Sequence, residues 1–156
     1  MLTTFVGICQ EARIVQIDCV KRVHRYEAAP SITTIYPCGY LRYSDSMDLY
    51  AYDISIIVDS VYINTKTYRM YVTANGFFDD PELELRTDKE ELFRFQPIYI
   101  NNARDYFEVT IPSEVIPKIR SGEITLVTVH HKWTRADYLN PPIRCGDFLK
   151  DFIAKY

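Results

Sequence analysis

The chain has 156 residues, with 25% charged and 47% hydrophobic residues, so it is long enough for a core of its own, and neither disorder nor a membrane-embedded chain is expected. Its formal net charge of −3 argues against binding nucleic acid or anionic lipid through a general positive field. Tyrosine is abundant, with 13 residues against only five glycines, which favours strands packed by aromatic rings.

The cysteines and the N-terminal residues indicate the compartment. Cys9, Cys19, Cys38 and Cys145 form no CxxC pair and lack zinc-finger spacing, so we interpret them as reduced, mostly buried thiols. The first residues lack the basic segment of a secretory signal peptide. No apolar run approaches the ~18 residues of a transmembrane helix. The sequence therefore predicts a cytoplasmic protein without a transmembrane segment.

The N-terminal part of the chain predicts short strands. We expect them over residues 3–9, closed by Gln10 and Glu11, over 13–21 and over 31–36. A basic cluster, in which Val23 and Tyr26 are interleaved as in a solvated edge strand or loop, consists of Lys21, Arg22, His24 and Arg25. Residues 37–39 predict a sharp turn, and residues 40–48 a loop or a short edge strand.

Residues 49–74 predict a central hairpin. The first half alternates, with Tyr52, Ile54, Ile56 and Val58 on one side, which is the period of a half-buried strand. After Asp59 the apolar positions shift by one, so we expect a β-bulge or a turn at Asp59 and Ser60. A tight loop at 64–66 leads into a return strand over 67–74, with Arg69 and Tyr71 on the side opposite Tyr68.

Further strands are expected after this hairpin. An exposed turn over 77–81 precedes strands at 82–86, 92–100, 106–111 and 124–130. Pro97 interrupts the second of these, which indicates an edge position or a bulge. Ser113 is expected to cap one helical turn over 113–120. Asp147 is expected to cap a final helix with one apolar face, formed by Phe148, Leu149, Phe152, Ile153 and Tyr156.

The predicted elements define a fold class. About eight strands are separated by turns, without alternation of strands and helices. We therefore predict an all-β, mainly antiparallel fold, either a β-sandwich or a flattened barrel, with a short C-terminal helix. No internal repeat or linker divides the chain, so residues 1–156 are expected to form a single β-sandwich domain.

Signatures of catalysis and cofactor binding are absent from the sequence. There is no GxGxxG, Walker loop, GxSxG or HExxH motif. His130 and His131 are neighbours on a predicted strand and face opposite sides, so they cannot easily share a metal ion. An acidic run without EF-hand spacing contains Asp79, Asp80, Glu82 and Glu84. We predict no catalytic residue, no metal site, no cofactor and no enzymatic activity, although a His or Cys site formed only by folding stays open.

Rings interleaved with arginines mark the candidate interaction surface. It comprises Tyr40, Arg42, Tyr43, Arg69, Tyr71 and the only tryptophan, Trp133. The leading hypothesis is a non-enzymatic protein–protein interaction module. One alternative is a self-assembling structural protein, such as the matrix or coat subunit of a virus, which forms homo-oligomers. Another is a single-stranded nucleic-acid-binding protein, which the net charge disfavours.

Overall fold

The computed structural model describes residues 10–11, 13–16, 21–26, 29–36, 39–44, 51–62, 65–131, 143–145 and 147–156. Within these residues the chain is mostly antiparallel β structure in two sheets with a short C-terminal helix, which confirms the predicted all-β class. These residues contain thirteen strands instead of about eight, because the strand expected over 92–100 is divided in two and short strands also form over Gln10–Glu11, Lys21–Tyr26, Gly39–Ser44 and Ile143–Arg144. The described sheets do not close into a barrel, so the architecture is sandwich-like.

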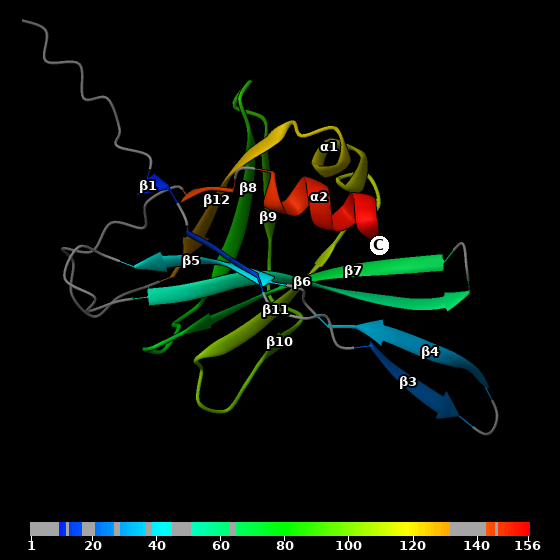
Figure 1. Cartoon of the computed structure of the whole chain (residues 1–156). Coiled ribbons are helices and arrows are strands. Elements are labelled where there is room, and N and C mark those ends of the chain that lie inside the picture. The colour runs from blue at the N-terminus through cyan, green and yellow to red at the C-terminus, as the bar shows by residue number, and fades with distance from the viewer. Residues whose placement is uncertain are drawn as a thin grey trace, which may run out of the picture.

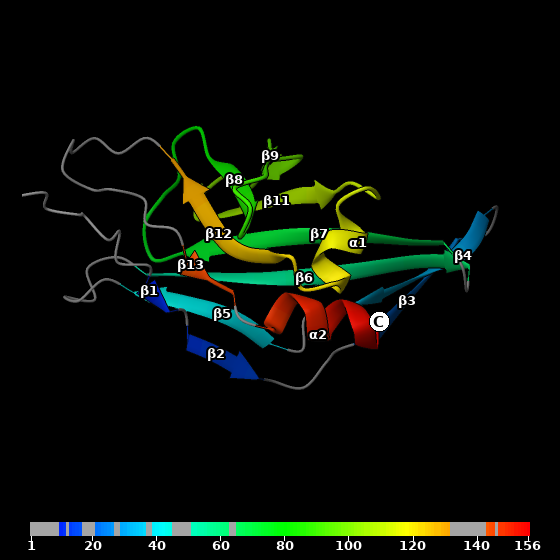
Figure 2. The same cartoon turned by 90° about the horizontal axis from the view of Figure 1, so that it is seen from above.

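The smaller sheet has five strands in the order β1-β13-β12-β8-β9. Its strands are β1 (Gln10–Glu11), β8 (Glu82–Thr87), β9 (Leu92–Phe95), β12 (Ile124–His130) and β13 (Ile143–Arg144). All neighbouring pairs are antiparallel except β1 and β13. Helices α1 (Ile116–Arg120) and α2 (Phe148–Lys155) lie against each other beside this sheet, and together they cover one side of β6 and β7 (Figures 1 and 2).

The larger sheet has eight strands. They are β2 (Arg13–Gln16), β3 (Lys21–Tyr26), β4 (Ala29–Ile35), β5 (Gly39–Ser44), β6 (Ala51–Tyr62), β7 (Thr65–Ala74), β10 (Tyr99–Ile100) and β11 (Tyr106–Ile111). The order β10-β11-β7-β6-β4-β3 forms the main path, and β5 joins β2 to β6. Because β7 occupies one edge of β6, the strands β4 and β5 share its other edge, each along one half. Buried Ser55 lies near this division, and its hydroxyl donates to the carbonyl of Gly39.

The β6–β7 hairpin confirms the predicted centre of the fold. Ile54, Ile56, Met70 and Val72 are fully buried on one face of the hairpin, as their alternation predicts. The expected irregularity is a shift of register between Ser60 and Tyr62, so the strand is bulged and not ended at this point. Residues 65 and 66 of the predicted loop belong to β7, and residue 64 lies outside the described residues.

The core lies between the two sheets and beneath the helices. Its fully buried members from the smaller sheet and from β11 are Leu83, Leu85, Val127, Val129, Ile143, Phe107 and Val109. Leu149, Phe152 and Ile153 of α2 complete it, which confirms the predicted apolar face of this helix. Removing such a side chain from water stabilises the fold by roughly 1.5–3 kcal/mol.

Three sequence predictions about individual strands and turns are corrected. Gln10 and Glu11 form strand β1 instead of closing an earlier strand. The segment expected to be a loop or edge strand from Tyr40 contains β5, which lies between β2 and β6 inside the sheet. In the predicted exposed turn, Phe78 is buried and its ring packs edge-on against Phe107 at 4.8 Å.

The helix starts also differ from the predictions. Val115, and not Ser113, is the N-cap of α1, and no side-chain hydrogen bond caps this helix. Asp147 occupies the N-cap of α2 without a capping side-chain bond. Residues 3–9, expected to form the first strand, lie outside the described residues. Neither of the two helices among the described residues has the length and apolarity needed to cross a membrane.

Pro97 marks a change of sheet. The predicted strand over 92–100 is divided into β9, at the edge of the smaller sheet, and β10, at the edge of the larger sheet. The expected edge position is therefore confirmed for both halves. Since proline has no N–H to donate to a ladder, the chain leaves one sheet at this residue and enters the other.

Candidate functional site

The predicted interaction residues lie on two different faces of the larger sheet. Tyr43 shares the inner face with Leu41, is only 7% exposed, and packs its ring 4.9 Å from that of Tyr52. The residues on the outer face, which points away from the core, are Tyr40, Arg42, Arg69 and Tyr71. Trp133 lies outside the described residues. The structure therefore does not join the predicted set into one surface.

Arg42 is held by a carboxylate on the neighbouring strand. Its Nε and Nη2 atoms donate to the two oxygens of Asp53, each at 2.8 Å, because the β5–β6 register places these residues opposite each other. This hydrogen bonding and the charge of Asp53 raise the pKa of Arg42 above its ordinary value. The guanidinium also lies 5.4 Å from the Tyr40 ring centre, within cation–π range.

Arg69 lies between two carboxylates on the outer face. Its Nη2 is 2.8 Å from Asp59 Oδ2, and its Nη1 is 2.5 Å from Glu108 Oε2. Burial lowers the pKa of Arg69, but the charges of Glu108 and Asp59 outweigh this and raise it overall. Tyr106, which donates to Glu108 and stacks on Tyr71 at 5.5 Å, has its pKa raised by burial and by this carboxylate. We call Arg69, Asp59 and Glu108 the Arg69 network.

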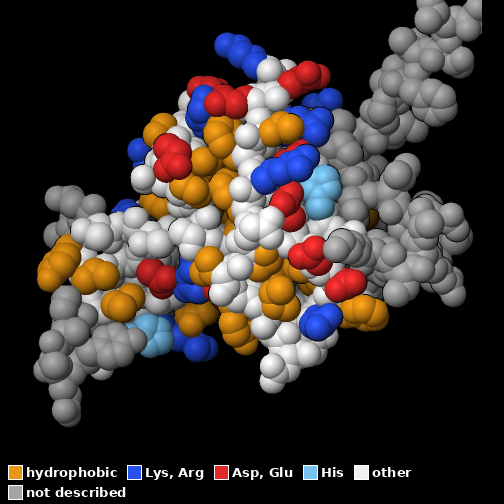
Figure 3. Space-filling model, turned by 180° about the vertical axis from the view of Figure 1, so that it is seen from behind, with side chains coloured by type: hydrophobic (Ala, Val, Ile, Leu, Met, Phe, Trp, Pro, Cys, Tyr) orange, Lys and Arg blue, Asp and Glu red, His pale blue; other side chains and the backbone are white. Residues whose placement is uncertain are grey.

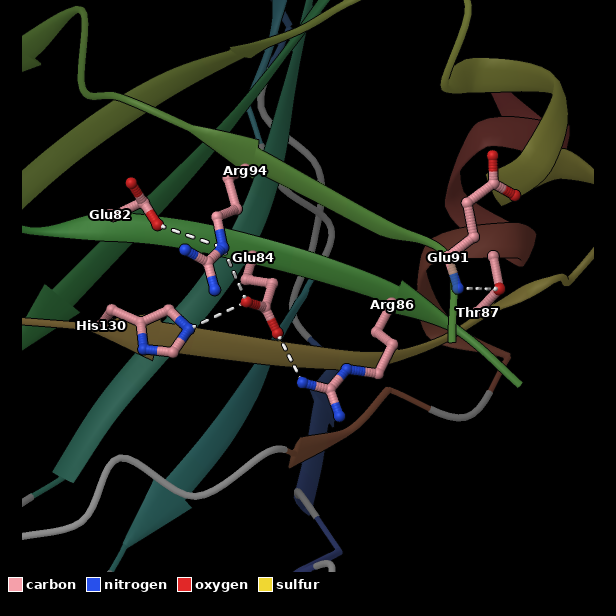
Figure 4. Close-up of polar contacts among 7 residues, drawn as sticks. All are labelled: Glu82, Glu84, Arg86, Thr87, Glu91, Arg94 and His130. Atoms are coloured by element: carbon pink, nitrogen blue, oxygen red, sulfur yellow. Dashed lines mark hydrogen bonds and ion pairs between the residues drawn. The ribbon is translucent and has the colours of Figure 1, made fainter. Parts of the chain in front are cut away.

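A second network surrounds Glu84 on the outer face of the smaller sheet (Figure 4). Glu84 is only 1% exposed, although its neighbours Leu83 and Leu85 are the residues that face the core. Its Oε1 accepts a hydrogen bond from Arg86 Nη2 at 2.9 Å, and its Oε2 accepts one from Arg94 Nε at 3.1 Å. His130 Nε2 lies 3.1 Å from the same Oε2. We call Glu84, Arg86, Arg94 and His130 the Glu84 network.

Three strands position the Glu84 network. The turn between β8 and β9 is fixed because the Thr87 hydroxyl accepts the Glu91 N–H at 3.1 Å. That turn sets the register in which Arg94 lies directly opposite Glu84. On the other side, β12 pairs with β8 and brings in His130. The sequence offered no local signal for this arrangement, because its partners are separated by whole strands.

The chemistry of Glu84 fits an ion pair more closely than a catalytic base. Burial raises its pKa, but the hydrogen bonds from Arg86 and His130, and their charges, outweigh burial, so the pKa is lowered overall. A carboxylate with a lowered pKa is a weak base. Glu84 therefore serves to hold three strands of the smaller sheet together.

The remaining candidate groups lie apart from one another. His131 is buried with its ring centre 5.7 Å from that of Phe78, on the side of the strand opposite His130, as predicted. Burial raises the pKa of the Cys145 thiol to about 12, and its Sγ donates to the carbonyl of Ile124. Within the described residues, no group of three or more His, Cys, Asp or Glu side chains is placed to hold a metal ion.

The edge of the larger sheet at β10 is apolar and exposed. Ile98, Tyr99 and Ile100 are 58%, 54% and 40% exposed, and no described strand pairs with the outer side of β10. A pocket of about 550 Å³ lies beside it, lined by Phe78, Asp79, Asp80, Ile100, Asn101, Asn102 and Arg104. The sequence contained the signal for this edge, namely three apolar residues directly after Pro97.

Within the described residues, the fold and these surfaces define a mainly antiparallel, sandwich-like β protein that carries the Arg69 network, the Glu84 network and the open apolar edge at β10. Comparisons with protein-family models, with curated proteins and with solved structures give no match.

Proposed function

We propose that the chain acts by binding protein and not by catalysis, and that the partner adds a strand to the open edge of β10. The observation that supports this proposal is the run of three exposed apolar side chains, Ile98, Tyr99 and Ile100, on an edge strand. Natural proteins blunt such edges with charges, prolines, bulges or short strands, because an exposed apolar edge pairs readily with another chain. β10 has only two residues and follows Pro97, but its apolar side chains stay exposed, and strand addition uses an exposed edge strand.

The backbone of Ile100 points toward the open side. The Asn101 N–H donates to the Tyr106 carbonyl of β11 at 3.1 Å. Because backbone groups alternate in direction along a strand, the N–H and C=O of Ile100 then face away from β11. These groups are available for hydrogen bonds to an incoming strand.

The adjacent pocket offers a place for a partner side chain. Ile100 lines the pocket as well as the edge, so a strand paired with β10 would pass its opening. The pocket combines the ring of Phe78 with the carboxylates of Asp79 and Asp80 and the guanidinium of Arg104. In strand addition, backbone bonds supply affinity and such pockets supply side-chain specificity.

A second copy of the chain is one such partner, which corresponds to the alternative of a self-assembling structural protein. Two β10 edges can pair antiparallel across a two-fold axis, because each presents the same groups to the other. The exposed hydrophobic run supports this alternative as well as a different protein partner.

The test is the mass in solution, measured by light scattering after size exclusion over a wide range of concentrations. The wild type is compared with Ile100→Lys and with Leu92→Lys, which places the same charge at an exposed apolar position on β9. A mass that rises with concentration in the wild type and in Leu92→Lys, but not in Ile100→Lys, supports pairing of β10 edges.

If the wild type stays monomeric, a photoreactive phenylalanine analogue at position 99 tests for a different partner in cells that express the chain. Protein adducts that Ile100→Lys abolishes and Leu92→Lys preserves support the proposal. A monomer that gives no adducts, or the same adducts in both variants, contradicts it.

A further inference from the structure

The β3–β4 hairpin carries a concentration of positive charge that the proposed binding edge at β10 does not use. We call this hairpin the basic arm. It extends from the end of the larger sheet in Figures 1 and 2. Lys21, Arg22, Val23, His24 and Arg25 are all exposed, and β3 is the edge strand of this sheet within the described residues. Figure 3 shows basic and histidine side chains together at this end of the molecule.

Among the described residues, the cations of the arm lack the carboxylate partners that hold several arginines in the two sheets. Arginines in the two sheets, such as Arg42, Arg69 and Arg94, form ion pairs with carboxylates. No described carboxylate forms an ion pair with Lys21, Arg22 or Arg25. Asp59 faces the arm across Thr34, but its carboxylate is already bound by Thr34 and Arg69.

The net charge of the chain has little influence at the tip of the arm. Only three of the seven residues of β4, Thr33, Thr34 and Ile35, pair with β6. The other four continue beyond this pairing by ~13 Å, at about 3.3 Å per residue. This exceeds the screening length of ~8 Å at physiological ionic strength, so distant carboxylates of the body are largely screened from the tip, where His24 and Arg25 lie. Lys21 and Arg22 lie at the base of the arm, opposite Ile35 and Thr34.

The arm also positions an aromatic ring beside a guanidinium. The Arg22 guanidinium lies 5.0 Å from the centre of the Tyr36 ring. Single-stranded nucleic acids stack their bases on aromatic rings and arginines, and nearby free cations neutralise their phosphates. Charges that only protect an edge strand need no such ring.

From this geometry we infer that the basic arm binds single-stranded nucleic acid, with Lys21, Arg22 and Arg25 at the phosphates and Tyr36 stacked on a base. This function is independent of protein binding at β10. The positive charge of the basic arm alone would also attract an acidic peptide or an anionic lipid surface, so the experiment includes both as competitors.

Fluorescence anisotropy with a labelled oligothymidylate, repeated with oligouridylate, measures the affinity over a salt series. With three phosphate contacts, the logarithm of the binding constant is expected to fall with the logarithm of salt concentration with a slope of about −2. The double variant Arg22→Gln/Arg25→Gln is expected to bind about tenfold more weakly at low salt and to reduce the slope by about 1.4. Tyr36→Leu is expected to weaken binding about fivefold or more, without changing the slope.

The matched control is Lys89→Gln/Lys150→Gln, which removes the same charge at two exposed lysines outside the arm. It is expected to bind like the wild type, and thermal melting checks that every variant is folded. Absence of saturable binding, equal weakening by the control variant, or equal competition by polyglutamate or by phosphatidylserine vesicles overturns the inference. Loss in the arm variants alone, with retained binding in the presence of these competitors, supports it.

Discussion

The ion networks on the outer faces of the two sheets have central groups of opposite charge. On the larger sheet one cation, Arg69, lies between two carboxylates. On the smaller sheet one carboxylate, Glu84, lies among two arginines and a histidine. Only the second centre can lose its charge within the pH range in which proteins are handled. The two faces should therefore respond differently to substitution and to acid.

The largest effect is expected from the core that both faces share. Ile56→Asp places a charge at a fully buried position of β6, which should destabilise the protein by more than about 4 kcal/mol or unfold it. Urea denaturation followed by circular dichroism measures this. Thr65→Asp, at an exposed position of β7, is the control and should change stability by about 0.5 kcal/mol or less. An unchanged melting curve for Ile56→Asp would refute the placement of β6.

Removing the central anion should be the next largest effect. Glu84→Gln removes the buried carboxylate shared by Arg86, Arg94 and His130 and leaves only the partly exposed Glu82, 3.6 Å from Arg94 Nε, so we expect a loss of about 3 kcal/mol at neutral pH. The control is Glu114→Gln, an exposed glutamate outside the network, which should leave the urea midpoint nearly unchanged. Equal midpoints for wild type and Glu84→Gln would show that the network does not stabilise the sheet.

Acid should reduce the difference in stability between the wild type and Glu84→Gln. The folded-state pKa of Glu84 is lowered, so its contribution is complete above the unfolded-state pKa of about 4.3 and is lost as the pH falls through the folded-state value. The stability gap between wild type and Glu84→Gln should narrow as the pH falls below about 4.3. Urea titrations from about pH 5 downward measure the gap. A gap that widens below about pH 4.3 contradicts the lowered pKa.

Removing the central cation of the Arg69 network should reduce the free energy of unfolding by somewhat less. Arg69→Gln leaves Asp59 and Glu108 without their common partner, but both are partly exposed and can turn toward water, so we expect about 2 kcal/mol. The double variant Arg69→Gln/Glu108→Gln should recover part of this loss, because it removes one of the two like charges. Urea denaturation of the single and double variants measures the coupling, and strictly additive losses would argue against a network.

Breaking the exposed ion pair between Arg42 and Asp53 should have the smallest effect on stability. The Arg42 side chain is 49% exposed, so its paired geometry with Asp53 is expected to contribute about 0.5 kcal/mol or less. Arg42→Gln should therefore shift the thermal midpoint much less than Arg69→Gln does. A loss as large as that of Arg69→Gln would mean that exposure does not distinguish the two arginines.

Much of the fold was predictable because a strand can be recognised from the residue pattern of a short stretch of sequence. The alternation around Ile54 and Ile56, the slip after Asp59 and the apolar face of the last helix each require only a short stretch of sequence. The interior position of β5 was missed because its polar, tyrosine-rich sequence resembles an exposed strand. Its neighbours β2 and β6 are set by pairing that no local pattern records.

The candidate site was less predictable for a related reason. Tyr43 was assigned to an exposed surface on residue type, although alternation with Leu41 would have placed it in the core. The Glu84 network joins residues of three strands, and its partner His130 lies far along the chain. Only the registers of β8, β9 and β12 bring these groups together, and a single sequence does not specify registers across strands.

The change of sheet at Pro97 has a consequence for how the molecule unfolds. Only residues 96–98 separate β9 from β10, so the edge of one sheet is tied to the edge of the other by a very short length of chain. Neither edge can detach far without pulling on its counterpart, and a partner that holds β10 would also restrain β9. Amide hydrogen exchange at the two edges should therefore slow together, as one cooperative opening unit that spans both layers.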